Sequence, residues 1–276
     1  MDFDSVEVVK GCVEDAAGIE SILRNANTDT VFHLAAINVN IGTTVPPAAI
    51  FETNIRGTWN VLEACRLTPS VGRVVIASSR EAEEVRDTHL SDAPSGPRRK
   101  RHPYQVSKIS AELVAQAYSD TYDMPVVISR SDNIYGGRDL NWNRLIPGTV
   151  RSLFSGEAPM LRSDGMLMRD YVHIEDMVKA YLMLASRATD AGIRGEVFHF
   201  ATGTSTSVLE IVTHLCELAG RPDLKPVILN QSKGERVNQE RSTERERDLL
   251  GWSSRVRIRE GLRSTVDWYR NYFGYE

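Results

Sequence analysis

Two neighbouring hydroxyls and a Tyr-x-x-x-Lys pair are the residues of this chain with the clearest chemical potential. Ser78 and Ser79 end a short apolar run without polar alternation, which predicts a parallel strand covered on both faces. In open α/β sheets, reactive groups gather at the carboxyl ends of strands, where these serines lie. Pro103 predicts the start of a helix, so Tyr104 and Lys108 are expected one turn apart on one helix face.

That spacing has a chemical consequence for the tyrosine. An ammonium group one turn from a phenol favours the phenolate and lowers a pKa that is ordinarily near 10. Tyr104 is therefore predicted to act as a general acid or base near neutral pH, with a strand-end serine binding the oxygen on which it acts. The alternative is a surface tyrosine near a helical lysine, because this motif also occurs by chance. The strand before it and the apolar helix after it favour the catalytic interpretation.

Composition narrows the class of protein. The chain has 276 residues, of which 41% are hydrophobic and 25% charged, as is typical of a globular protein. A net charge of −4 gives no reason to expect a nucleic-acid partner. We also expect no membrane span, no signal peptide and no metal site. The three widely separated cysteines, Cys12, Cys65 and Cys216, are predicted to be free thiols in a cytoplasmic protein.

Helical and strand patterns alternate along the first half of the chain. This alternation predicts an α/β fold with a doubly wound parallel sheet. Strands are expected at residues 6–10, 30–36, 73–79, 125–130, 195–200 and 226–229. Helices are expected at residues 15–26, from 47 onward, from 104 onward, and at 145–154, 208–219 and 258–272. From about residue 139 the regular alternation is lost.

Two charged segments can be interpreted either as solvent-exposed surface or as part of a functional site. Residues 233–248 carry dense charges of both signs, which favours a solvated face. Residues 98–102 form a basic run directly before Tyr104. A solvated loop is the favoured interpretation, and the alternative is an anion clamp that lowers the pKa of the tyrosine.

Several motifs in the same order resemble the extended short-chain dehydrogenase/reductases, specifically the NAD-dependent epimerase/dehydratase group that acts on nucleotide sugars. The resemblance covers nearly the whole chain and includes a C-terminal Leu-Gly-Trp followed by Gly-Leu and Trp-Tyr. The motifs are His33-Leu34-Ala35-Ala36, Asn54-Ile55-Arg56-Gly57-Thr58, Ser79 with Tyr104 and Lys108, Asn133-Ile134-Tyr135-Gly136, and Arg169-Asp170-Tyr171-Val172-His173 with Asp176.

The resemblance implies a catalytic role for each member of the triad. Tyr104 would deprotonate a sugar hydroxyl while hydride leaves for the nicotinamide. Lys108 would lower the pKa of Tyr104 and bond the nicotinamide ribose. Ser79 would share the hydroxyl proton.

The resemblance also implies binding residues for NAD(P) and for a nucleotide sugar or related metabolite. The cofactor would contact the turn formed by Leu34, Ala35 and Ala36, together with Asn54, Tyr104 and Lys108. Asn133 and Arg169 would position the substrate diphosphate, as a bidentate guanidinium can, and Arg236 is a candidate second diphosphate arginine.

Glu81 bears on the type of reaction. Dehydratases of the family carry an acid at the second position after the catalytic hydroxyl, where this chain has Glu81, and that acid removes the C5 proton. Arg80 replaces the neighbouring acid of those enzymes. The choice between epimerase and dehydratase is therefore open.

The chain departs from the family at its start. The family begins with a strand and a Gly-x-x-Gly-x-x-Gly turn whose amides meet the cofactor pyrophosphate, whereas Met1 falls just before the family's third strand. Cys12 stands where the family places an acid that contacts adenine. We therefore expect a truncated Rossmann-like domain at residues 1–138, bearing the Ser/Tyr/Lys site. A smaller α/β, mainly substrate-binding lobe at residues 139–276 is expected to interleave with it.

This departure keeps two alternatives open beside an NAD(P)-dependent enzyme. One is a cofactor-independent enzyme on the same scaffold that catalyses a non-redox isomerisation, elimination or cyclisation. The other is a non-catalytic partner subunit. In either case the strand at residues 30–35 would lose its neighbour, and unpaired buried backbone groups each cost about 1–3 kcal/mol. We expect residues 6–10 to pair with it, or a second chain to do so in a homo-oligomer.

Overall fold

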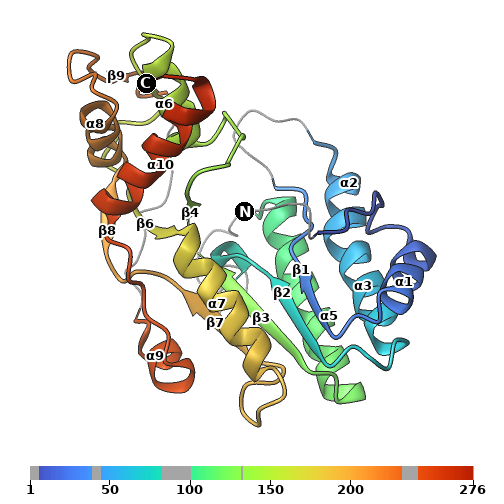
Figure 1. Ribbon diagram of the computed structural model, residues 1–276. Helices are drawn as coiled ribbons and strands as arrows, with labels where there is room; N and C mark the ends of the chain where they lie inside the picture. Colours follow the sequence, from blue (N-terminus) through green and yellow to red (C-terminus); the bar gives the residue numbers. More distant parts are fainter. Residues whose placement is uncertain (1–5, 39–44, 83–100, 132, 232–241, 276) are drawn as a thin grey trace, which may run out of the picture. The chain divides into compact units, whose positions relative to one another are not determined.

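The computed structural model covers residues 1–276 and describes residues 6–38, 45–82, 101–131, 133–231 and 242–275 (Figure 1). The chain divides into two compact units. Unit 1 comprises residues 1–39, 43–129 and 184–197, and unit 2 comprises residues 40–42, 130–183 and 198–276.

Unit 1 is built around a parallel sheet, as the alternating pattern predicts. Strand β1 pairs in parallel with β2, and β2 pairs in parallel with β3, in a four-stranded sheet of order β1-β2-β3-β7. Its elements are α1 (Ala16–Asn25), β1 (Thr30–His33), α2 (Pro47–Phe51), a π-helical turn (Glu52–Arg56), α3 (Gly57–Arg66), β2 (Arg73–Ala77), α5 (Pro103–Tyr122) and most of β3 (Val126–Ser131). Strand β7 (Val197–Phe200) begins at the last residue of unit 1 and continues in unit 2.

The burial of β2 on both faces accounts for its run of apolar residues. Val74, Val75 and Ile76 are all buried, so both faces of the strand are covered and no polar residue alternates with them. Helices α3 and α5 lie side by side (Figure 1). Side chains of α3 join Val74, Ile76 and residues of β3 in one apolar core. Ala115 of α5 belongs to the same core, which therefore packs the middle of α5 against β2 and β3.

Two helix starts are set by local capping. The Asp15 side chain accepts the amide N–H of Gly18 at 3.0 Å and so caps α1, which lies within the helix predicted at residues 15–26. At α5, Pro103 occupies the first turn, and His102 Nδ1 accepts the amide N–H of Tyr104 at 3.2 Å. These interactions confirm a helix that begins at the residue before Tyr104.

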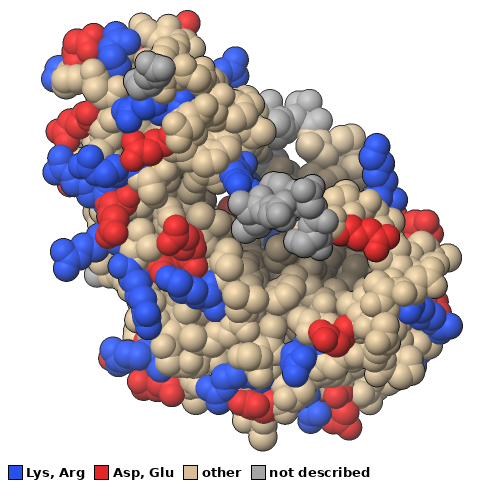
Figure 2. Space-filling view, in the orientation of Figure 1, with Lys and Arg blue, Asp and Glu red and all other residues tan. Residues whose placement is uncertain are grey.

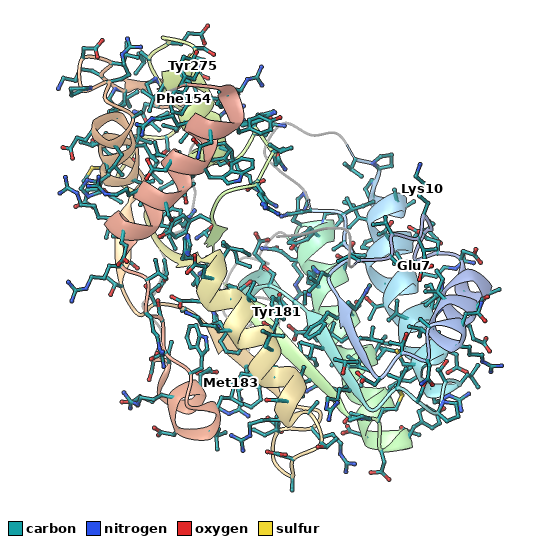
Figure 3. The ribbon with its side chains drawn as sticks, viewed as in Figure 1. Glu7, Lys10, Phe154, Tyr181, Met183 and Tyr275 are labelled. Carbon is teal, nitrogen blue, oxygen red and sulfur yellow. The ribbon has the colours of Figure 1, made fainter. Side chains whose placement is uncertain are left out.

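The prediction of a strand at residues 6–10 is wrong. The segment has no regular structure, and Val8 is 80% exposed. Glu7 and Lys10, labelled in Figure 3, project from it. The ladder described for β1 runs to β2, so residues 6–10 do not take the place beside β1 that we expected. Without a neighbouring strand, nothing holds this valine-rich stretch extended. A second chain as the partner of β1 stays a prediction.

Unit 2 packs helices against small sheets. Strands β4 and β6 are parallel, β6 and β8 antiparallel, and β5 and β9 form a separate pair. At the end of the chain the Tyr275 ring stacks on Phe154 with centroids 5.0 Å apart (Figure 3). The elements are β4 (Asn133–Tyr135), α6 (Leu145–Phe154), β5 (Met160–Leu161), β6 (Met168–His173), α7 (Ile174–Arg187), β8 (Ser205–Ser207), α8 (Val208–Leu218), β9 (Val227–Ile228), α9 (Glu244–Leu250) and α10 (Ile258–Phe273).

The charged run at residues 233–248 is only partly described, and its described part contains helix α9. Glu246 in this helix is 3% exposed, and its carboxylate accepts the amide N–H of His199 at 2.8 Å. The prediction of a solvated face is therefore wrong for this residue. Arg236 lies outside the described residues.

The described surface and helices agree with the composition. On the face shown in Figure 2, acidic and basic side chains are interspersed. Among the helices that the structure describes, none has both the length and the apolar character required to cross a bilayer.

Candidate active site

A buried cation lies at the carboxyl end of β2. Lys108 is 7% exposed, and its ammonium donates to the backbone oxygen of Ala77 at 2.9 Å. Burial lowers the pKa of Lys108 to about 8, and the negative charge of Glu112 partly opposes that shift. The lysine is therefore mostly charged at neutral pH and loses its proton in mildly alkaline solution.

The predicted catalytic hydroxyls come from α5 and from the residues just after β2. Tyr104 is buried and precedes Lys108 by one turn of α5. Ser79 is half-buried just beyond β2, and its Oγ accepts the amide N–H of Glu81 at 3.3 Å. Glu81 is itself half-buried. All four predicted catalytic residues thus belong to unit 1, on α5 or immediately after β2.

A directed set of hydrogen bonds begins at His33, the last residue of β1. His33 Nε2 lies 3.0 Å from Thr58 Oγ1, and the Thr58 hydroxyl donates to the backbone oxygen of Asn54 at 2.7 Å. A hydroxyl has a single proton, so Thr58 must accept from the imidazole. This assigns the proton of neutral His33 to Nε2.

Asn54 extends these bonds to the catalytic helix. Its Nδ2 donates to Ser107 Oγ at 2.9 Å and to the Ile37 oxygen at 3.0 Å, while its Oδ1 accepts the Ile37 amide N–H at 2.7 Å. The Ser107 hydroxyl donates to the backbone oxygen of Tyr104 at 2.7 Å. Asn54 lies in the π-helical turn, a rare geometry that is frequent at functional sites. It therefore ties the turn after β1 to the first turn of α5.

The three other predicted cofactor residues form that turn. Leu34 is 57% exposed, Ala35 is exposed and Ala36 is half-buried. The two alanines carry no bulk beyond a methyl group, so the backbone of this turn is accessible to a flat ring system. Asn54 holds the backbone of Ile37, the residue that directly follows this turn.

Glu112 is a residue of this site that sequence reasoning missed. It is completely buried, and its carboxylate accepts the Ser78 hydroxyl at 2.5 Å. A signal was present in the sequence, because a glutamate four residues after Lys108 must lie on the same helix face.

The predicted substrate residues belong to unit 2, on adjacent strands. Asn133 begins β4, and its Nδ2 donates to the backbone oxygen of Asp170 at 2.9 Å on β6. Arg169, also on β6, is half-buried and lies opposite Thr206 of β8. Asn133 and Arg169 thus lie on neighbouring strands of the same three-stranded sheet.

The acids of the same motif have structural partners. The Asp170 carboxylate accepts the amide N–H groups of Thr202 and Gly203 at 2.8–3.0 Å. Asp176 Oδ2 accepts the amide N–H groups of Arg255 and Val256, both at 2.9 Å. These carboxylates hold loops in place. In the described part of the chain, no three His, Cys, Asp or Glu side chains are grouped so as to hold a metal ion.

The fold and this constellation agree with comparisons to known proteins. The model of the NAD dependent epimerase/dehydratase family matches residues 2–200. The chain belongs to this family.

Individual relatives are named as dehydratases or as enzymes with an epimerase activity. A dTDP-glucose 4,6-dehydratase of Actinoplanes sp. is 31% identical over 262 residues, which are 95% of this chain and 79% of that protein. A trifunctional UDP-glucose 4,6-dehydratase/UDP-4-keto-6-deoxy-D-glucose 3,5-epimerase/UDP-4-keto-L-rhamnose-reductase of Arabidopsis thaliana is 26% identical over 95% of this chain. The chain spans only 39% of that plant protein.

A solved structure gives the same result for the fold. The dTDP-glucose 4,6-dehydratase DesIV of Streptomyces venezuelae, whose crystal structure contains NAD, matches with a TM-score of 0.80 and 29% identity. The match covers 97% of this chain and 81% of DesIV.

The burial of His33 predicts a pH dependence of folding stability. Burial, and secondarily the charge of Lys108, lower the pKa of His33 to about 4. In the unfolded chain, His33 takes up a proton near pH 6.5, whereas in the folded protein it stays neutral until about pH 4. The free energy of unfolding therefore falls as the pH drops from about 6.5 to about 4. His33→Gln keeps a donor to Thr58 but cannot be protonated. The loss of unfolding free energy at acidic pH should therefore be smaller in this variant than in wild type, by up to about 3 kcal/mol.

Urea unfolding at pH 7 and at pH 4.5 measures this difference. His214→Gln, a substitution in unit 2, serves as the control and should follow the wild-type dependence. Parallel losses in wild type and His33→Gln would show that the buried imidazole does not control acid stability.

Proposed function

We propose that this chain is an epimerase/dehydratase-type enzyme that acts on a nucleotide sugar and uses Tyr104 to move the proton of a sugar hydroxyl. The observation that carries the proposal is the buried Lys108 ammonium one turn from the buried Tyr104, beside the carboxyl end of a parallel strand. Family membership supports the substrate class, because dehydratases and epimerases of nucleotide sugars are among the relatives.

The roles of the three residues follow from their chemistry. Lys108 favours the ionised form of the neighbouring phenol, which then accepts the hydroxyl proton of the sugar. Ser79 donates a hydrogen bond to the same sugar oxygen and shares its proton. In the reverse direction, Tyr104 returns the proton to that oxygen.

The residues of unit 1 fit the nicotinamide end of NAD. The small-residue turn formed by Leu34, Ala35 and Ala36 offers backbone to a flat ring, and the Lys108 ammonium suits a ribose hydroxyl. When bound, the nicotinamide supplies a hydride acceptor for the carbon that bears the deprotonated oxygen. A Gly-x-x-Gly-x-x-Gly turn is not among the 276 residues, so we assign no residue to the pyrophosphate.

Glu81 is the candidate base for a proton on the sugar ring. It follows Ser79 by two residues, and its amide N–H is bonded to Ser79 Oγ, so its backbone is held beside the catalytic hydroxyl. Relatives that are dehydratases support this role, whereas Arg80 in place of a second acid weakens it. The proposal therefore includes both epimerisation and dehydration.

Asn133 and Arg169 are proposed to bind the substrate diphosphate. A guanidinium forms two parallel hydrogen bonds with phosphate oxygens, and the half-buried position of Arg169 limits competition from water. Arg236 is kept as a further candidate, although it lies outside the described residues.

Removal of the Tyr104 hydroxyl tests its role as the proton carrier. Tyr104→Phe keeps the ring and removes the hydroxyl, so turnover of an accepted nucleotide sugar should fall at least about a hundredfold. The reaction is followed by proton NMR of UDP-glucose and dTDP-glucose incubated with the protein and NAD. Tyr122→Phe, at the exposed end of the same helix, should retain turnover. Near-wild-type turnover of Tyr104→Phe would remove this residue from the mechanism.

Removal of the Arg169 guanidinium tests the proposed diphosphate site. Arg169→Ala should weaken binding of UDP and dTDP by about 1.5–3 kcal/mol, the range for hydrogen bonds to charged groups. Calorimetric titration measures this loss, and Arg263→Ala, which alters an exposed arginine of the same unit, should bind normally. If Arg169→Ala also binds as wild type does, the nucleotide-sugar assignment loses its proposed anchor.

A further inference from the structure

Helix α5 carries a second buried charge beyond the proposed catalytic pair. Tyr104, Lys108 and Glu112 recur every four residues, so they form one stripe along the helix. All three are buried, and Glu112 has no solvent exposure. An isolated buried carboxylate costs several kcal/mol, so its retention in the core calls for a compensating partner.

The contacts of Glu112 and Lys108 converge on two successive residues at the end of β2. The Glu112 carboxylate accepts the Ser78 hydroxyl at 2.5 Å, and the Lys108 ammonium donates to the Ala77 oxygen at 2.9 Å. The Ser78 amide N–H is in turn bonded to the Ser129 oxygen of β3 at 2.7 Å. The carboxylate and the ammonium thus hold the same strand end, one residue before Ser79.

We propose that Glu112 is a positioning residue of this site: its carboxylate keeps Lys108 in the ammonium form and fixes Ser78, and thereby the backbone that presents Ser79. This inference rests on the proposed function in one respect: the proposed function explains why Lys108 needs to be charged. The electrostatic coupling and the strand-end contact stand on the geometry of α5 and β2.

The groups around Lys108 support a specific role for this carboxylate. His33 of β1 interacts electrostatically with the lysine, and it is neutral at pH 7 because its pKa is lowered to about 4. Tyr104 lies one turn before the lysine on its own helix. Within the described residues, Glu112 is the charged group that raises the pKa of Lys108 against the effect of burial.

Glu112→Gln tests the proposal without a substrate. The amide oxygen still accepts the Ser78 hydroxyl, so the substitution removes the charge and keeps the shape. The chain has six lysines, so the titration of Lys108 can be followed by NMR of protein labelled with carbon-13 at lysine Cε, with Lys108→Arg for assignment. We expect the pKa of Lys108 to fall by about one pH unit or more in Glu112→Gln.

Asp120→Asn is the matched control, because it removes an exposed carboxylate two turns further along the same helix. The pKa of Lys108 should be unchanged in this variant. An unchanged pKa in Glu112→Gln as well would overturn the proposal.

A second measurement needs no variant and covers the case in which Glu112→Gln does not fold. In wild-type protein labelled at glutamate Cδ, the Glu112 resonance should show a step at the pKa of Lys108, because coupled groups report each other's titration. Absence of that step would equally overturn the proposal. Neither measurement depends on turnover, so a failure of the proposed function, seen as normal turnover of Tyr104→Phe, is distinguishable from a failure here.

Discussion

The burial of the Lys108 ammonium at the carboxyl end of β2 is the constraint on which the rest of the site depends. Moving such a cation out of water costs several kcal/mol unless hydrogen bonds and opposite charge compensate. The Ala77 oxygen supplies a hydrogen bond and Glu112 supplies the charge. Shifted lysines of this kind cluster at functional sites, because a lysine that titrates near neutrality can respond to a ligand or a substrate.

Lys108 and Glu112 can meet the end of β2 only if α5 begins at a fixed position relative to the sheet. His102 and Pro103 set the first turn, and the parallel packing of β2 between β1 and β3 sets the strand end. The bonds from Asn54 to Ser107 and from Ser107 to Tyr104 then join the turn after β1 to the same helix. Supporting interactions of this type keep reactive side chains within a fraction of an ångström of a working geometry.

Much of this arrangement is readable from the sequence, because it depends on local rules. The unalternating run in β2 indicates burial on both faces, and Pro103 indicates where α5 begins, so the shared face of Tyr104 and Lys108 follows. Strand β8, at Ser205–Ser207, is too short and too polar for its pattern to be distinguished from a turn.

The burial of charged residues is the part that is hardest to predict from the sequence: the spacing of Glu112 from Lys108 indicates a shared helix face, but it does not indicate that the carboxylate is buried. Glu112 and Glu246 have the composition of surface residues, and their burial depends on partners 34 and 47 residues away, the Ser78 hydroxyl and the His199 amide N–H. The failed strand at residues 6–10 has the same origin. Its valines suit a sheet, but a strand forms only where a neighbour supplies a ladder.

We propose that the charged Lys108 and the turn at Leu34–Ala36 form the nicotinamide-binding part of an NAD-linked site. Calorimetric titration of the protein with NAD⁺ tests it most directly, in wild type and in Lys108→Met. We expect wild-type binding tighter than about 100 μM, near −5.5 kcal/mol, and at least tenfold weaker binding, by about 1.4 kcal/mol, in the variant. Folded protein that shows no binding up to about millimolar NAD⁺, or equal affinity in the two proteins, would contradict it.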